Sequence, residues 1–418
     1  MHRDFSIEPP RRRFSVGASA RFFYLGEAIA RVYEPTQTQL SDLDRAYQST
    51  GEYLVTCPEF DGLLYLVHAH GSRQLGTMVR PMEEYREGFD IDLAACLTRE
   101  GLQRYGGAGG PARLINDLYA ALKRYADRHN LKIERDDRCV TITYAGGMKA
   151  DFAPIIDDAS HVVLHGETHG RIPDRDLQRY MSTNPRGYCR AFDSIAQVAP
   201  AFELRVELNA TFESLRKSEL LPLPDAEEVF ARLLSRLTQL AKINRNIAFG
   251  APTSGENLAP PSCVVTTLVA NAYAIEAPKP HDGPMDLLLD IVQLMPRLIK
   301  RFPMPEGSEF WYLDNPTAQN DNLAAGMNTK AKQQAFDAWC ERLVADLTSL
   351  VDAIDQGAGM DVIARAVERA FGPRARAAVL GDNAQRREAN RSANRGIFVV
   401  GSSAVVSTPT FAHTNFGD

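Results

Sequence analysis

The hydrophobic pattern of this chain changes near residue 160, and the change predicts a fold in two parts. Before it, short apolar or alternating segments indicate strands at 63–69, 89–97, 131–135, 138–145 and 148–156. Helical periodicity separates them at 37–57 and 113–129. Beyond about residue 170 the pattern is almost entirely helical, with the clearest segments at 229–243, 262–277, 286–301, 329–356 and 359–371. The sequence therefore predicts an α+β fold, in which a sheet lobe precedes a helical lobe.

Three regions follow from this pattern. We expect residues 1–160 to form the sheet lobe together with an N-terminal helix, and residues 161–380 to form the helical lobe. Residues 381–418 are first polar and then rich in Ser, Thr and apolar residues without a period, which predicts a flexible C-terminal tail. A chain of 418 residues is long enough for two packed lobes.

Composition excludes several classes of protein. A net charge of -6 gives no global basic field, so we expect no stable nucleic-acid partner and no membrane surface. No run of 18 apolar residues occurs, and Arg and Pro interrupt the first residues where a signal peptide would be apolar. The six cysteines are scattered without a CxxC pair, so a structural zinc site is not expected. These features predict a cytoplasmic protein with free thiols.

One pair of acids stands out on a predicted strand. Asp90 and Asp92 alternate with Phe89, Ile91 and Leu93, so both carboxylates project from one face and can reach one metal ion. Taken alone, the pair is more typical of a solvent-facing strand edge. The neighbouring motifs decide between these interpretations.

Two motifs favour chemistry at this pair. Gly71-Ser72 follows an apolar strand and precedes a short helix, and its free N–H groups and hydroxyl suit a triphosphate. Asp151 lies among apolar residues on a strand predicted to lie beside the first, where an unpartnered carboxylate would be costly to bury. Three carboxylates beside a phosphate-binding turn are what two magnesium ions need for in-line phosphoryl transfer.

At these positions the sequence resembles the polymerase-beta-like nucleotidyltransferase superfamily, through HGSRQLGT, FDIDL and KADFAPI. Within it, the chain is similar to the CD-NTases of bacterial CBASS anti-phage defence, which are cyclic-oligonucleotide synthases related to cyclic GMP-AMP synthase. The similar stretches lie between about residues 40 and 325 and include GSRQLGTMVRP, STNPRGYCRAF, LAKINRNIAFG, PPSCVVTTLVA and LDNPTAQNDNLA. The resemblance implies an active site in the cleft between the sheet lobe and the helical lobe.

The resemblance also implies a role for each site residue. Asp90 and Asp92 would hold two Mg²⁺ ions, with Mn²⁺ as an alternative, and Asp151 would hold one and help activate a ribose hydroxyl. Gly71 and Ser72 would hold the donor triphosphate. Lys242, in LAKINRN, would reach the phosphates from the helical lobe. Nucleoside triphosphates, ATP and GTP among them, would be joined into a cyclic di- or trinucleotide, with pyrophosphate released.

Several questions stay open at this point. A linear oligonucleotide synthase or another nucleotidyltransferase of the superfamily would use the same residues, and a catalytically silent nucleotide sensor could keep the fold. The C-terminal tail is a candidate docking or conjugation segment for a CBASS accessory protein. Aromatic candidates for stacking on a base are Tyr85, Tyr188, Phe249 and Tyr273.

Overall fold

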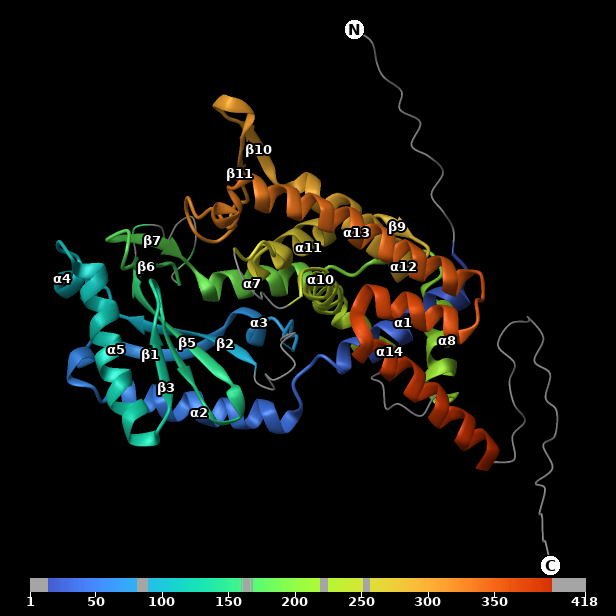
Figure 1. Ribbon diagram of the computed structural model, residues 1–418, viewed down its shortest axis with the longest axis horizontal. Coiled ribbons are helices and arrows are strands. Elements are labelled where there is room, and N and C mark those ends of the chain that lie inside the picture. Colours follow the sequence, from blue (N-terminus) through green and yellow to red (C-terminus); the bar gives the residue numbers. More distant parts are fainter. Residues whose placement is uncertain are drawn as a thin grey trace, which may run out of the picture.

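The computed structural model describes residues 14–80, 89–158, 160, 166, 168–218, 225–250 and 256–392. Figure 1 shows a sheet lobe on the left and a larger helical lobe on the right, with helix α7 (Pro185–Ala196) running between them. The predicted α+β class is confirmed.

A seven-stranded mixed sheet forms the first lobe. Its main path runs β1 (Leu64–His70), β2 (Asp90–Leu97), β5 (Lys149–Asp157), β4 (Val140–Thr143) and β3 (Lys132–Arg135). Strands β6 (Gly170–Asp174) and β7 (Arg179–Thr183) continue it from β5. Strands β2 and β5 are parallel, while β1 is antiparallel to β2 and β4 is antiparallel to β5. All five strands predicted before residue 160 are present.

Two amphipathic helices cover one face of this sheet. Helices α2 (Gln37–Val55) and α5 (Gly110–His129) share an apolar core with the inward-facing side chains of the strands. Ile91, Leu93 and Phe152 are fully buried in that core. Because side chains alternate along a strand, the residues between them face the opposite side. Two shorter helices, α3 (Gly71–Gln74) and α4 (Gly101–Tyr105), follow β1 and β2.

The second lobe is helical and has its own core. Its longer helices are α1 (Val16–Arg31), α8 (Arg205–Ser218), α10 (Leu233–Phe249), α11 (Ser262–Glu276), α12 (Pro284–Leu294), α13 (Lys330–Asp355) and α14 (Met360–Ser392), with the short α9 (Ala226–Ala231) before α10. A hairpin of β10 (Lys300–Pro303) and β11 (Glu309–Tyr312) projects from this lobe in Figure 1. A small parallel pair joins β8 (Ala201–Phe202) to β9 (Pro280–His281).

The lobe boundaries differ from the predicted ones. The sheet continues through β7 to Thr183, so a division at residue 160 falls inside it. Helix α1 belongs to the helical core, because its apolar side chains pack with those of α10 and α13 and not with the sheet. The described part of the chain therefore begins in the helical lobe with α1, then forms the sheet lobe, and after β7 continues in the helical lobe.

Two helical segments also differ. The segment 286–301 is predicted as one helix, but its α-helix ends at Leu294. Pro296 has no N–H to continue the helical hydrogen bonds, and a 3₁₀ turn follows over Met295–Leu298. Helix α14 is broken at Gly372, which has a φ of 84° and precedes Pro373, and its second part runs to Ser392, so residues 381–392 of the predicted tail are helical. Seven of these twelve residues are Ala, Arg, Gln or Glu, which favour helix. Residues 393–418 lie outside the described residues.

A buried ion pair fastens α1 to α10. The Arg236 guanidinium donates to both carboxylate oxygens of Glu27, at 2.6 and 2.7 Å, and to Glu34 at 2.9 Å. Arg236 and Glu27 are almost completely buried. Loss of either partner would leave an uncompensated charge in the core.

Within the described ranges, every helix is too short or too polar to cross a bilayer.

Candidate active site

The three predicted carboxylates lie on neighbouring strands. Asp92 on β2 is directly opposite Asp151 on β5 in the parallel register, and Asp90 is two residues before Asp92. Paired residues of adjacent strands share a face, and so do residues two apart. All three side chains therefore leave the sheet on the face opposite its apolar core.

Burial and mutual repulsion disfavour ionisation of two of these acids. Burial raises the pKa of Asp92, and the nearby Asp90 carboxylate raises it further, while Lys242 opposes both effects. Burial likewise raises the pKa of Asp151, with Asp92, Asp90 and Asp136 adding to the effect. A cation placed among these groups would stabilise the ionised carboxylates against both effects.

A threonine on β4 supports Asp151. The Thr141 hydroxyl donates to Asp151 Oδ1 at 2.6 Å and also lies 3.2 Å from Asp136 Oδ2. This hydrogen bond lowers the pKa of Asp151 against the effect of burial. Thr141 is opposite Asp151 in the antiparallel register of β4 and β5. Sequence reasoning missed it because the register between these strands cannot be read from the two segments separately.

The predicted Gly-Ser turn is in contact with the carboxylates. Gly71 opens the short helix α3 directly after β1, and its φ of +57° is in the left-handed region. A Cβ atom at this position would lie 2.2 Å from Asp92 Oδ2. The first N–H groups of a helix have no partner within the helix, so this turn can offer them to a ligand's anionic oxygens, although the Gly71 backbone also interacts with the Cys189 thiol.

Lys242 reaches the same region from α10. Its Nζ donates to Thr77 Oγ1 at 3.0 Å, and the side chain is 2% exposed. Burial, together with the charge of Arg245, lowers the pKa of Lys242 to about 7, although the Asp92 carboxylate opposes the shift. Lys242 is thus a buried amine, and its hydrogen bond to Thr77 holds it close to the Gly-Ser turn.

A cavity of about 1010 Å³ lies between the lobes, and we call it the interlobe cavity. The structure brings all six predicted site residues to its wall: Gly71, Ser72, Asp90, Asp92, Asp151 and Lys242. Of the aromatic candidates, Tyr188 and Phe249 line the interlobe cavity. Tyr273 does not, because it is fully buried and its hydroxyl donates to the Val198 carbonyl. Tyr85 lies outside the described residues.

The helical lobe contributes polar side chains that sequence reasoning did not select. Arg245 donates to the Pro260 carbonyl at 2.9 Å and to Ser262 Oγ at 3.0 Å, and burial lowers its pKa to about 10. Asp321 accepts from Asn315 at 2.8 Å, and burial raises its pKa. Both line the interlobe cavity. Arg245 lies one helical turn after Lys242, so the shared face of α10 was the available signal.

Comparisons with known proteins find similar sequences and folds. The Second Messenger Oligonucleotide or Dinucleotide Synthetase domain matches residues 27–195. The matched segment contains the Gly-Ser turn and the three aspartates but ends before Lys242. The cyclic dinucleotide synthase CdnG of Bradyrhizobium diazoefficiens is 24% identical over 362 residues, which cover 79% of each protein.

Solved structures share the fold. The B. diazoefficiens CD-NTase CdnG in complex with GTP superimposes with a TM-score of 0.60 and 18% identity, over 86% of this chain and 98% of that one. The CdnC:HORMA-deltaN complex of Escherichia coli MS115-1 gives a TM-score of 0.51 and 14% identity, over 84% and 97%.

The mixed sheet that carries the acids, the Gly-Ser turn beside it and the helical lobe across the cavity form a fold of the polymerase-beta-like type, which the chain shares with CdnG. Among proteins of this fold, the domain match and the sequence similarity to CdnG point to the nucleotidyltransferases that synthesise cyclic dinucleotides. Residues 27–195 match the second-messenger synthetase domain, and the chain is similar in sequence to the cyclic dinucleotide synthase CdnG and shares the fold of that CD-NTase.

Proposed function

We propose that this enzyme joins nucleoside triphosphates into a cyclic di- or trinucleotide second messenger for CBASS anti-phage defence. The observation that carries the proposal is the contact between the Gly71 turn and Asp92, beside Asp151, on the wall of the interlobe cavity. GTP is proposed among the substrates because CdnG, whose fold the chain shares, is bound to GTP. ATP is the other candidate.

The donor set fits two Mg²⁺ ions. Three carboxylates share one face, and the pKa values of Asp92 and Asp151 are raised by burial and by neighbouring acids, which favours a bound cation. Magnesium prefers carboxylate oxygens together with substrate phosphates. Asp90 and Asp92 would hold both ions and Asp151 one. When bound, the ions would stabilise the attacking and leaving oxygens of an in-line displacement.

The protein residues would perform the remaining steps. N–H groups of Gly71 and Ser72 would bind the donor triphosphate, and Lys242 would turn from Thr77 toward the phosphates. Asp151 would accept the proton of the attacking ribose hydroxyl. The new P–O bond forms at the α-phosphorus while the bond to pyrophosphate breaks. A second attack within the linear intermediate would close the ring.

Substitution of both paired acids tests the proposal. We expect Asp90→Asn with Asp92→Asn to abolish product while the protein remains folded, since the exchange removes charge with little change in volume. The assay incubates all four labelled triphosphates with Mg²⁺ or Mn²⁺ and analyses phosphatase-resistant products by mass spectrometry. The matched control is Asp127→Asn, an exposed acid on α5 paired with Lys123.

The same assay separates the rivals. A linear oligonucleotide synthase would yield products that phosphatase and nuclease degrade from free ends. A silent nucleotide sensor would release no pyrophosphate in the presence of metal. Synthesis that persists in the double variant would refute the catalytic assignment.

We also propose that the C-terminal segment after Ser392 binds a CBASS accessory protein. Support comes from CdnC, a protein of this fold that forms a complex with a HORMA protein. The test is co-expression with the proteins encoded by neighbouring genes, for the full chain and for a chain ending at Ser392. A truncated chain that keeps every complex would remove this idea.

A further inference from the structure

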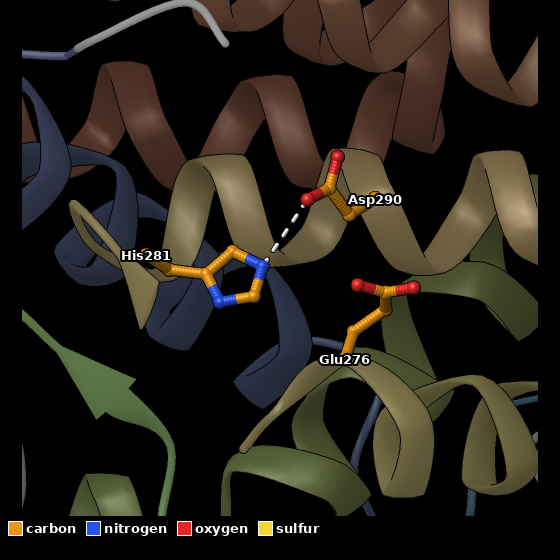
Figure 2. Close-up of side chains that lie close together, drawn as sticks. All are labelled: Glu276, His281 and Asp290. Atoms are coloured by element: carbon orange, nitrogen blue, oxygen red, sulfur yellow. Dashed lines mark hydrogen bonds and ion pairs between the residues drawn. The ribbon is translucent and has the colours of Figure 1, made fainter. Parts of the chain in front are cut away.

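A cluster of potential metal ligands lies in the helical lobe, outside the interlobe cavity. It joins Glu276 at the end of α11, His281 on β9 and Asp290 on α12 (Figure 2). One ligand atom from each residue lies within 4.8 Å of the other two. Figure 2 shows the imidazole and both carboxylates turned toward one another.

The imidazole is oriented as a ligand. The His281 Nδ1 lies 2.8 Å from the Lys279 carbonyl oxygen, so Nδ1–H donates there and Nε2 faces the carboxylates. Its Nε2 lies 3.2 Å from Asp290 Oδ2. Neighbouring donors of a tetrahedral zinc ion, each about 2.0 Å from the metal, lie roughly 3.3 Å apart. The observed separation therefore matches one edge of such a site.

Local charge favours a divalent cation. The His281 side chain is fully buried, and Glu276 is 6% exposed. Three carboxylates surround the imidazole, since Asp286 also lies close enough to act on its charge. Lys279, which pairs with Glu276 at 2.8 Å, is the cation of the cluster, and its side chain is 45% exposed. With a neutral imidazole these groups carry a net charge of about -2, which one divalent ion would balance.

Asp286 is not a ligand in this arrangement. Its two oxygens accept from the backbone N–H groups of Asp282 and Gly283, at 2.8 and 2.9 Å, and so cap the start of α12. The ligand set is thus one nitrogen and two carboxylates, with the fourth position available to water. Zn²⁺ binds His nitrogen and Asp or Glu oxygen, and its open sites take three protein ligands with water as the fourth.

We propose that Glu276, His281 and Asp290 form a Zn²⁺ site that braces α11 against α12. The opposite end of α11, at Ser262 and Cys263, lines the interlobe cavity. The ion would therefore hold a helix that forms part of the cavity wall. The site differs from a zinc finger because its ligands come from three separate elements and include no cysteine. It does not depend on the proposed catalytic function.

Zinc titration tests the proposal with the active-site acids removed. In the full chain carrying Asp90→Asn and Asp92→Asn, calorimetry with Zn²⁺ alone should show one ion bound per chain. Adding Glu276→Gln or Asp290→Asn should lower the affinity by roughly tenfold or more, because each removes a negatively charged ligand. Adding Asp127→Asn, far from the cluster on α5, should leave the affinity unchanged.

A second measurement separates a bound ion from a simple hydrogen-bonded histidine. Co²⁺ should give the visible absorption of a tetrahedral site in this background, and the absorption should disappear in the Asp290→Asn protein, whose circular dichroism shows that it is folded. The proposal is overturned if no ion binds, or if Zn²⁺ binds equally to the Glu276→Gln and Asp290→Asn proteins. A His281 imidazole that titrates by NMR at the same pH with and without Zn²⁺ would also overturn it.

Discussion

The carboxylate of Asp92 occupies the space where a Cβ atom of residue 71 would lie, 2.2 Å from Oδ2. Gly71 also has a φ of +57°, which few other residues adopt without strain. Two separate requirements therefore meet at this glycine. The turn requires a positive φ at residue 71, and the position of the Asp92 carboxylate leaves no room for a side chain there.

Gly71→Ala should reduce pyrophosphate release by about 100-fold or more. The added methyl group must displace the Asp92 carboxylate or the turn, and a shift of about 1 Å in a catalytic group costs on that order. The measurement is metal-dependent pyrophosphate release from the four nucleoside triphosphates.

Gly62→Ala is the matched control for this substitution. Gly62 has a φ of +68°, and a Cβ atom there would meet nothing within 4 Å. Both variants should lose about 1 to 2 kcal/mol of stability from the left-handed backbone alone. Only Gly71→Ala should lose activity, so an equal loss in both variants would contradict the argument.

Thr141→Val should move the acidic limb of the pH–rate profile to higher pH. The hydrogen bond at 2.6 Å stabilises the ionised form of Asp151, and its loss raises the pKa of that carboxyl further. The ionised form of Asp151 is the one that would bind metal and accept the proton. As pH falls, the variant should therefore lose activity at a higher pH than the unmodified protein. Rates measured between pH 5 and 9 test this.

Thr143→Val provides the comparison on the same strand. Thr143 is opposite Lys149 and is two residues from Thr141, so it shares the face and the strand position without the bond to Asp151. Its pH–rate profile should match that of the unmodified protein. Coincident profiles for all three proteins would refute a supporting role for Thr141.

Lys242→Met should stabilise the nucleotide-free protein while weakening triphosphate binding. Burial lowers the pKa of Lys242 to about 7, below its ordinary value of 10.5. The unfolded chain therefore binds this proton more tightly, and the penalty on folding is complete below about pH 7 and disappears as pH rises toward 10.5. We expect a gain on the order of 1 to 3 kcal/mol at pH 6.5.

Urea denaturation at pH 6.5, 8 and 9.5 checks the sign of this effect. The gain in unfolding free energy should shrink with each step in pH. Lys123→Met, which removes an exposed lysine paired with Asp127, should leave the unfolding free energy nearly unchanged at each pH. A Lys242→Met gain that grows with pH would contradict the assignment.

Arg236→Met should destabilise the helical lobe by roughly 3 to 5 kcal/mol. The substitution leaves the buried Glu27 carboxylate without the guanidinium that donates to both of its oxygens. Arg232→Met is the matched control, because Arg232 contacts Glu34 at 3.4 Å from an exposed position. It should cost less than about 1 kcal/mol. Similar midpoints for the two variants in thermal unfolding would contradict this difference.

Local patterns in the chain were sufficient to predict the strands, the α+β class and the face of the sheet that carries the acids. Side chains alternate along a strand whatever surrounds it, so Asp90 and Asp92 share a face in any fold that keeps this segment extended. The Gly-Ser turn after an apolar strand was visible for the same reason. Helix boundaries were less accurate at Pro296 and after residue 380, where neighbouring residues decide the end.

Relationships between distant segments needed the folded chain. The partnership of Thr141 with Asp151 depends on strand register, the close approach of Asp92 to Gly71 depends on the path of the turn, and the membership of α1 in the helical core depends on its packing. The lowered pKa of Lys242 also arises from burial, at a place where its amine contacts Thr77 of a distant segment. Each is a contact across many residues, and periodicity within one segment carries no information about such contacts.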